Sequence, residues 1–218
     1  WDFGPAADPT DVSAGTTLAF VSGGVSLTVT GWALDSANDT TYTAATLWRR
    51  NEGANDEGIS VCNSGDTCTD GAQSEIDNHG ALFDVIRLNL TDLTPLILQS
   101  VKLSSVDGTN DKFKIFGSNA TNPDLTSLSV TLLASGGPTG NPNPIIPLSG
   151  TWTFLYVTTD PASPQGTGGG DYLLNNLVAT PVPEPGTLLL LGSGLAGLGF
   201  LGRRRKRKGS RLTAAANR

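Results

Sequence analysis

The sequence of 218 residues contains no methionine, a single histidine and only two cysteines. One histidine and two cysteines fall short of the four ligands of a structural zinc site, so such a site is disfavoured. The missing methionine, together with Trp1 as the first residue, predicts that a leading segment has been removed, most simply a secretory signal peptide. An arbitrary boundary at Trp1 is the alternative that the sequence leaves open.

Charged residues are also scarce, at 16% of the chain, and they are unevenly distributed. Residues 1–184 contain six lysines and arginines against all 20 acids, a net charge of −14, whereas residues 185–218 contain eight cations and no acid. Phosphate contacts need clustered lysine and arginine, so the acidic body argues against binding of nucleic acid. The basic end requires a separate explanation.

No stretch of residues 1–180 has the apolar stripe of a helix, but several short stretches alternate between apolar and polar residues. Val25, Leu27 and Val29 share one face, and Ile86 and Leu88 share another. This alternation and the many turn residues predict an antiparallel β-sandwich domain, most simply a jelly roll, over residues 1–180. The predicted strands are 16–21, 24–33, 41–48, 83–90, 98–106, 112–116, 125–133, 151–158 and 171–179.

The two cysteines, Cys62 and Cys68, lie close together in a stretch rich in glycine, asparagine, serine and aspartate. In an exported chain such a pair predicts a local disulfide bond, which would restrain the acidic segment 51–78. A metal site that uses both thiolates is the alternative.

The C-terminal region begins with an extended, proline-rich segment at 181–185 and continues with seventeen uncharged residues at 186–202. As a helix the second stretch would be ~25 Å long, close to the ~30 Å hydrocarbon core of a bilayer, so it predicts a transmembrane helix. A cationic block follows and would keep the basic tail, 203–218, in the cytoplasm. A buried apolar helix with a disordered basic tail is the alternative. The block consists of Arg203, Arg204, Arg205, Lys206, Arg207 and Lys208.

The succession of Val182-Pro183-Glu184-Pro185, an apolar span and an arginine/lysine cluster closely resembles the PEP-CTERM sorting signal. The resemblance implies that Pro183, Glu184 and Pro185 are recognised by an exosortase, a membrane cysteine protease-transpeptidase of Gram-negative bacteria that make extracellular polysaccharide. It also implies transient anchoring in the inner membrane, later removal or exchange of the tail, and delivery to the cell surface or extracellular matrix. Residues 209–218 extend further past the basic cluster than is usual for this signal.

A second resemblance concerns the body. Gly58-Ile59-Ser60-Val61-Cys62, followed by Glu75-Ile76-Asp77-Asn78 and then Asp84, looks like the body of one group of exosortase-dependent surface proteins. This resemblance covers about 30 residues by its motifs and implies no known chemistry.

Oxygen-bearing side chains cluster in the same region, at Glu75, Asp77, Asn78 and Asp84. Calcium prefers oxygen ligands, often from one loop, so these four residues are candidate ligands for a calcium ion. Calcium is the one cofactor to which the sequence points. A solvated acidic loop, with Asp77 or Asn78 forming a turn, is the alternative.

The remaining residues bear on two further functions, carbohydrate binding and catalysis. Trp48, next to Arg49 and Arg50, is the best candidate for an exposed aromatic side chain that binds a glycan. His79 is the only histidine, and no nucleophile elbow or phosphate-binding glycine loop is present. We therefore expect no enzymatic activity.

Together these features predict an exported protein with a structural or adhesive role in a polysaccharide-rich surface layer. A calcium-dependent glycan-binding module is the rival prediction, and an enzyme is the least favoured. The expected partners are the exosortase, the membrane through the C-terminal helix, extracellular polysaccharide and, in a homo-oligomer, further copies of the chain.

Overall fold

The computed structural model describes residues 1–4, 12–13, 15–34, 41–51, 53, 56–63, 75–77, 83–93, 96–109, 111–121, 123, 125, 129–160, 172–181, 190–196 and 198. The chain divides into two compact units, Trp1–Thr180 and Pro181–Arg218. The division agrees with the change in composition at the proline-rich segment.

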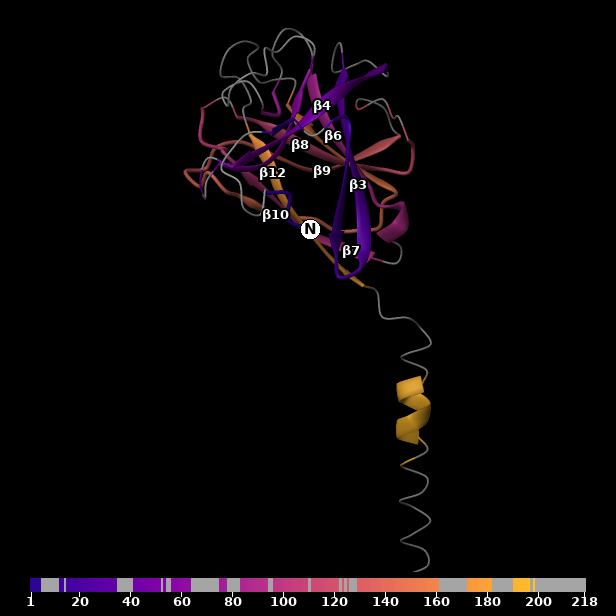
Figure 1. The fold of residues 1–218 in the computed structure, drawn as a ribbon. Helices are drawn as coiled ribbons and strands as arrows, with labels where there is room; N and C mark the ends of the chain where they lie inside the picture. The colour runs from indigo at the N-terminus through magenta and orange to yellow at the C-terminus, as the bar shows by residue number, and fades with distance from the viewer. Residues whose placement is uncertain are drawn as a thin grey trace, which may run out of the picture. The chain divides into compact units, whose positions relative to one another are not determined.

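The first unit is built from β-strands, and its only described helix is a single 3-10 turn, η3 (Thr91–Leu93) (Figure 1). Each of the nine predicted strands overlaps a strand of the structure, which confirms the all-β class. Three further strands, β1, β5 and β10, were not predicted. The strands are β1 (Val12–Ser13), β2 (Thr17–Ser22), β3 (Val25–Leu34), β4 (Tyr42–Asn51), β5 (Glu57–Cys62), β6 (Phe83–Asn89), β7 (Leu96–Ser104), β8 (Phe113–Ser118), β9 (Val130–Gly136), β10 (Ile145–Pro147), β11 (Phe154–Thr159) and β12 (Leu173–Pro181).

The strands form one sheet path, β10-β7-β12-β5-β4-β3-β6-β11-β8-β9, with β1 beside β4 and β2 beside β3. Strand β4 changes partner along its length: its first half pairs with β3, and its second half, from Thr46, pairs with β5. It therefore joins two parts of the sheet. We call β10, β7, β12 and β5 the β5 half, and β3, β6, β11, β8 and β9 the β6 half.

The two halves share one hydrophobic core. Its fully buried side chains include Ile59 and Leu174 from the β5 half and Ile86 and Leu155 from the β6 half. Burial of apolar surface on this scale is the main favourable term in folding. Two parts of an antiparallel sheet on a common core fit the predicted sandwich class, whereas the jelly-roll strand order stays a prediction.

The predicted alternation is confirmed in detail in the β6 half. In β3, Leu27 and Val29 are fully buried, and in β6, Ile86 and Leu88 are fully buried. The opposite face of β6 is buried too, because Val85 belongs to a second, aromatic-rich cluster. That cluster contains Leu34, Phe83, Val85, Phe116, Leu125, Phe154 and Tyr156.

In the second unit, Pro181 is the last residue of β12, and the described residues from 190 onward form a helix over residues 190–196 and at 198. Its leucines are exposed: Leu190, Leu191, Leu195 and Leu198 keep between 61% and 76% of their surface. Among the described residues, no helix has both the length and the apolar character needed to cross a membrane. The remainder of the predicted span, 186–202, lies outside the described residues, so the transmembrane helix stays a prediction.

Candidate functional sites

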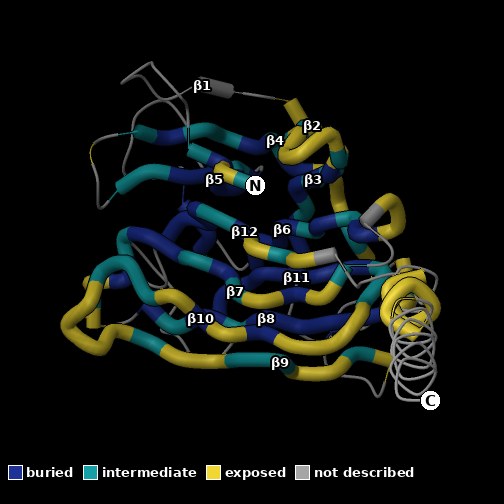
Figure 2. Tube along the Cα trace, turned by 90° about the horizontal axis from the view of Figure 1, so that it is seen from below, coloured by how far each residue is buried: buried dark blue, intermediate teal, exposed yellow. Residues whose placement is uncertain are grey.

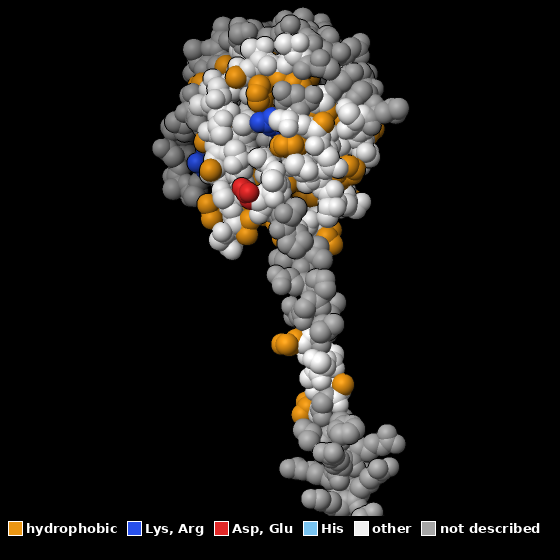
Figure 3. Space-filling view, turned by 90° about the vertical axis from the view of Figure 1, so that its right-hand side faces the viewer, with side chains coloured by type: hydrophobic (Ala, Val, Ile, Leu, Met, Phe, Trp, Pro, Cys, Tyr) orange, Lys and Arg blue, Asp and Glu red, His pale blue; other side chains and the backbone are white. Residues whose placement is uncertain are grey.

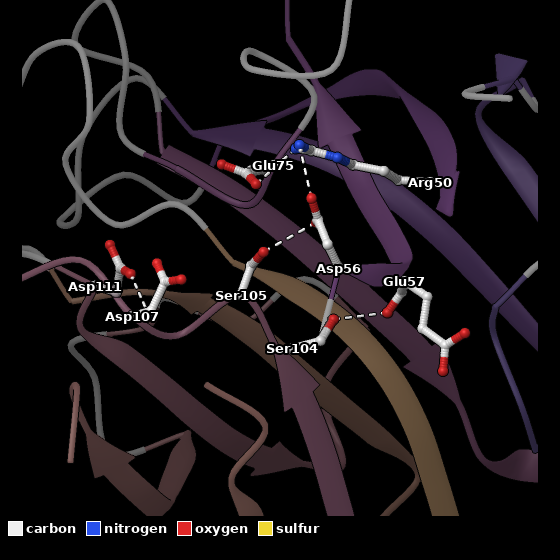
Figure 4. Close-up of polar contacts among 8 residues, drawn as sticks. All are labelled: Arg50, Asp56, Glu57, Glu75, Ser104, Ser105, Asp107 and Asp111. Carbon is white, nitrogen blue, oxygen red and sulfur yellow. Dashed lines mark hydrogen bonds and ion pairs between the residues drawn. The ribbon is translucent and has the colours of Figure 1, made fainter. Parts of the chain in front are cut away.

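A buried arginine joins two acidic segments at one end of the β5 half (Figure 4). Arg50, at the end of β4, is 7% exposed. Its Nη1 lies 2.6 Å from Oε1 of Glu75, and its Nη2 lies 2.9 Å from Oδ2 of Asp56. Glu75 is one of the predicted calcium ligands, and one of its carboxylate oxygens is held by this guanidinium.

The same network continues to the end of β7. The Ser105 hydroxyl donates a hydrogen bond to Oδ1 of Asp56 over 2.9 Å, and Ser105 itself has a left-handed backbone with φ of 60°. The neighbouring Ser104 hydroxyl donates to the backbone carbonyl of Glu57 over 2.6 Å. Polar contacts therefore join the start of β5 to the end of β7. In the turn after β7, the carboxylate of Asp111 accepts a hydrogen bond from the Asp107 amide (Figure 4).

The other predicted calcium ligands also make contacts within the protein. Asp84, on β6, is fully buried; its Oδ1 accepts a hydrogen bond from Asn63 Nδ2 over 3.0 Å, and its Oδ2 accepts one from the Asp77 amide over 3.2 Å. Its own amide donates to the Asp77 carbonyl over 3.0 Å. Asp84 thus fastens segment 75–77 to β6, and Asn78 lies outside the described residues.

No group of three or more histidine, cysteine, aspartate or glutamate side chains is arranged to hold a metal ion within the described part of the chain. Glu75, Asp77 and Asp84 do lie in one region, but their described contacts go to Arg50, to Asn63 and to backbone groups. Calcium binding at these residues stays a prediction.

Tyr172, just before β12, is fully buried beside this region. Burial raises the pKa of its phenol well above the ordinary value, and the negative charges of Asp84, Asp111 and Asp160 raise it further. Among the residues that the structure describes, its hydroxyl has no hydrogen-bond partner, and the same holds for the buried hydroxyl of Thr159. A buried hydroxyl without a partner is destabilising, and Tyr172 therefore marks a weak point in the core.

Trp48, the predicted glycan-binding residue, is half-buried on β4. It lies opposite Ser60 of β5 in the strand register. The indole Nε1 of Trp48 and the hydroxyl of Ser60 are both buried without a hydrogen-bond partner within the described part of the chain. Both atoms are closed to solvent, and Trp48 is not the freely exposed platform that its neighbours Arg49 and Arg50 suggested.

A second aromatic site was missed by the sequence analysis. The guanidinium of Arg87 lies 5.0 Å from the ring centroid of Trp32 and 5.5 Å from that of Phe154. Arg87 Nε also donates to the Thr30 hydroxyl over 3.1 Å. Trp32 on β3 and Arg87 on β6 lie on the same face of the sheet. Their contact depends on the pairing of β3 with β6, which could not be predicted from the alternation within each strand.

Several predicted residues lie wholly or partly outside the described part of the chain. Cys62 ends β5, but Cys68 is outside the described residues, so the disulfide stays a prediction. Also outside the described residues are His79, the basic cluster 203–208 and the four residues Val182, Pro183, Glu184 and Pro185.

Comparison with known proteins bears on the C-terminal region. The PEP-CTERM protein-sorting motif matches residues 181–206, which include Pro183, Glu184 and Pro185, the apolar span and the first part of the basic cluster. A search of the curated proteins found no match to the chain. The chain therefore carries a PEP-CTERM protein-sorting motif and is an exported protein that an exosortase, a membrane enzyme, sorts to the cell surface.

Proposed function

We propose that the body of this protein is a structural or adhesive element of a polysaccharide-rich surface layer and has no catalytic step of its own. The observation that carries the proposal is the sorting motif at residues 181–206, because it determines where the body is delivered. The proposal includes a Gram-negative cell, transient anchoring in the inner membrane and later removal or exchange of the tail.

The polar contacts of the body support a scaffold. Arg50, Glu75 and Asp56 form a buried ion network, and Asp84 fastens one segment of the chain to β6. Such contacts fix loops to strands, so these acids have a structural use. Within the sequence, no recognised catalytic motif offers a competing role.

The sorting step assigns a physical role to each part of the tail. Alternating prolines keep the segment around Glu184 extended, which suits a processing enzyme that binds a stretched chain. The apolar span holds that segment at the membrane, and the basic block keeps the end on the cytoplasmic side. Recognition thus depends on a short linear motif presented close to the membrane enzyme.

The test of the sorting step replaces Glu184 with lysine in the full chain and follows an epitope in the body through cell fractions. We expect the variant to stay in the membrane at full length, whereas the wild type reaches the surface. Asp92→Asn, which changes an exposed acid on η3, is the control and should sort normally. Normal sorting of Glu184→Lys would contradict the assigned role of the motif.

The structural role is tested separately, by removing the gene and measuring how much polysaccharide and protein the surface layer retains under shear. We expect a weaker layer, restored by the wild-type chain and not by the Glu184→Lys variant. A layer of normal strength in the deletion strain would refute the structural role and leave the sorting step intact.

The alternative function is a calcium-dependent glycan-binding module. The observation that favours it is the half-buried aromatic side chain of Trp48 on β4, since ligand sites are lined by aromatic side chains with a few polar groups. Binding to a glycan array that requires calcium and is lost in a folded Trp48→Ala variant would favour the module. Equal binding with and without calcium, or by both proteins, would exclude it.

A further inference from the structure

Strand β9 is the last strand of the β6 half and has one open edge. Within the described residues it pairs only with β8, and Figure 2 shows it at the margin of the body with mostly exposed and half-buried residues. The outer edge of such a strand presents backbone N–H and C=O groups that can pair with another strand. Natural proteins usually block an edge of this kind.

The opposite end of the sheet path has such a block, and β9 lacks most of it. Strand β10 is only three residues long, ends at Pro147 and follows Pro144, and proline cannot donate to a neighbouring strand. Strand β9 has seven residues and contains neither proline nor a charged residue. Its one irregularity is a bulge at Leu133, which has no partner in the register with β8.

The stretch of sequence that contains β9 is free of charge although the body is strongly acidic. On the neighbouring strand β8, Lys114 lies opposite Ser135 of β9 and forms an ion pair with Asp160. No charged residue occurs between 125 and 159, a stretch that includes β9, β10 and β11, whereas residues 1–184 carry a net charge of −14. Figure 3 shows how few charged side chains one face of the body presents. Leu132 on β9 is 51% exposed and Ile145 on β10 is 69% exposed. Two copies of the chain would repel each other over acidic surface, but not where their β9 strands meet.

We propose that β9 pairs with β9 of a second copy of this chain, antiparallel and across a two-fold axis. A self-pair of this kind is isologous, and an uncharged strand places no like charges opposite each other. The bulge at Leu133 leaves Val130–Leu132 as the uninterrupted part, so the pair is short and its association depends strongly on concentration. In this arrangement Leu132 packs against the strand of the second copy.

This inference deepens the proposed structural role and rests on it for its biological meaning, because a pairing edge gives the surface protein a means of self-assembly. The physical claim is separate, since pairing is measured on the purified chain without any sorting enzyme.

The experiment uses the full chain in a mild detergent and measures sedimentation velocity over a wide range of protein concentration. Wild type is expected to form a species of twice the protein mass as concentration rises. In a two-fold pair over Val130–Leu132, Leu132 lies opposite Val130 of the second copy, so Leu132→Lys places two like charges diagonally across the pair and a charge against each apolar strand. The variant should therefore raise the dissociation constant at least about tenfold. Ile145→Lys introduces the same charge on β10, at a residue with more exposed surface, and should associate as wild type does.

A charge-swap mixture makes the test specific. Leu132→Lys and Leu132→Glu are each expected to be monomeric alone. An equal mixture of the two variants is expected to form a mixed dimer. A wild type that stays monomeric at every concentration would overturn the proposal, and so would equal loss of association in Ile145→Lys. Association that survives in Leu132→Lys would assign it to another surface, including the tail that all variants share.

The two proposals fail in different ways. If Leu132→Lys loses pairing in solution but restores a normal surface layer in the deletion strain, the pairing stands and its structural use is refuted. If wild type does not pair but the layer depends on the protein, the structural role stands and the β9 inference is refuted.

Discussion

In the body, the groups that hold the structure together come from distant parts of the sequence, whereas the sorting motif is one continuous run of residues. Asn175 reaches Glu57 across 118 positions in the chain, and Arg50 reaches Glu75 across 25. The motif at 181–206 needs no such pairing to be recognised. A change in the tail should therefore alter the location of the protein without altering its stability. A change in the body should alter stability without altering location.

The largest expected effect comes from the basic cluster of the tail. Replacing residues 203–208 with glutamine removes the charges that, in the proposed topology, hold the end on the cytoplasmic side. We expect the full-length chain to lose its membrane retention almost completely and to appear unprocessed outside the cell. Fractionation and mass determination of the tagged chain measure this effect.

A matched control for the cluster is available further along the tail. Replacing Arg211 and Arg218, which lie beyond the matched motif, should leave sorting unchanged. Both variants should unfold at the same temperature as wild type. A lowered melting temperature of the body in the cluster variant would show that the stability of the body depends on the tail.

The next effect in size belongs to the buried ion network. Arg50→Met leaves Glu75 and Asp56 without the guanidinium that lies 2.6 and 2.9 Å from them. Breaking a buried ion pair from one side costs about 3–5 kcal/mol, and we expect the lower end because the Asp56 side chain is 22% exposed. Denaturant unfolding of the full chain measures the loss.

Lys114→Met provides the comparison for Arg50→Met. Lys114 Nζ lies 3.1 Å from Asp160 Oδ1, but the two side chains are 28% and 21% exposed. Solvent screens such a pair, so its loss should cost only about 0–1 kcal/mol. Equal losses for the two variants would show that the Arg50 network does not hold the β5 half together.

The sequence predicted the features that depend on neighbouring residues and missed those that depend on contacts between distant residues. The strands β3 and β6 were predicted because alternation is local, as in Leu27 and Val29. Strand β5 was missed because Glu57–Cys62 lies in an acidic, glycine-rich stretch and is stabilised by pairing with β4 and β12. The partners of Arg50 and Arg87 were missed for a related reason, since strand order and loop placement decide which side chains meet. The tail motif was found from its residues alone.

Gly58, on strand β5, gives an effect that does not exceed that of Arg50→Met. An added Cβ there would lie 2.5 Å from the backbone oxygen of Leu174, and the residue has a φ of 154°. Backbone cannot move aside easily, so Gly58→Ala should cost about 3 kcal/mol or somewhat less if β12 shifts. Thermal unfolding of the full chain measures this cost.

Gly24→Ala separates the two causes. Gly24 has a φ of 81° and no atom within 4 Å of an added Cβ, so it experiences backbone strain alone. We expect a loss of about 1 kcal/mol. If Gly58→Ala costs no more than Gly24→Ala, close approach between β5 and β12 is not what requires glycine in the Gly58–Cys62 segment.

The smallest expected effect is a gain, at the buried phenol of Tyr172. Because its hydroxyl has no hydrogen-bond partner among the described residues, Tyr172→Phe removes an unsatisfied polar group and should stabilise the body by about 1 kcal/mol. Tyr156→Phe is the matched control: the Tyr156 hydroxyl donates to the Ala120 carbonyl over 2.9 Å, so this variant should lose about 1 kcal/mol.

The same phenol predicts a dependence on alkaline pH. Burial and three aspartates raise the pKa of Tyr172 above its ordinary value of 10.0, so the folded state favours the neutral phenol. The unfolded chain loses this proton near pH 10.0 while the folded chain keeps it, so stability falls as pH rises above that value. Tyr172→Phe should flatten this fall, measured as melting temperature between pH 8 and pH 11 (about the range that brackets tyrosine ionisation). An unchanged slope would mean that water reaches the phenol, and the gain at neutral pH should then disappear as well.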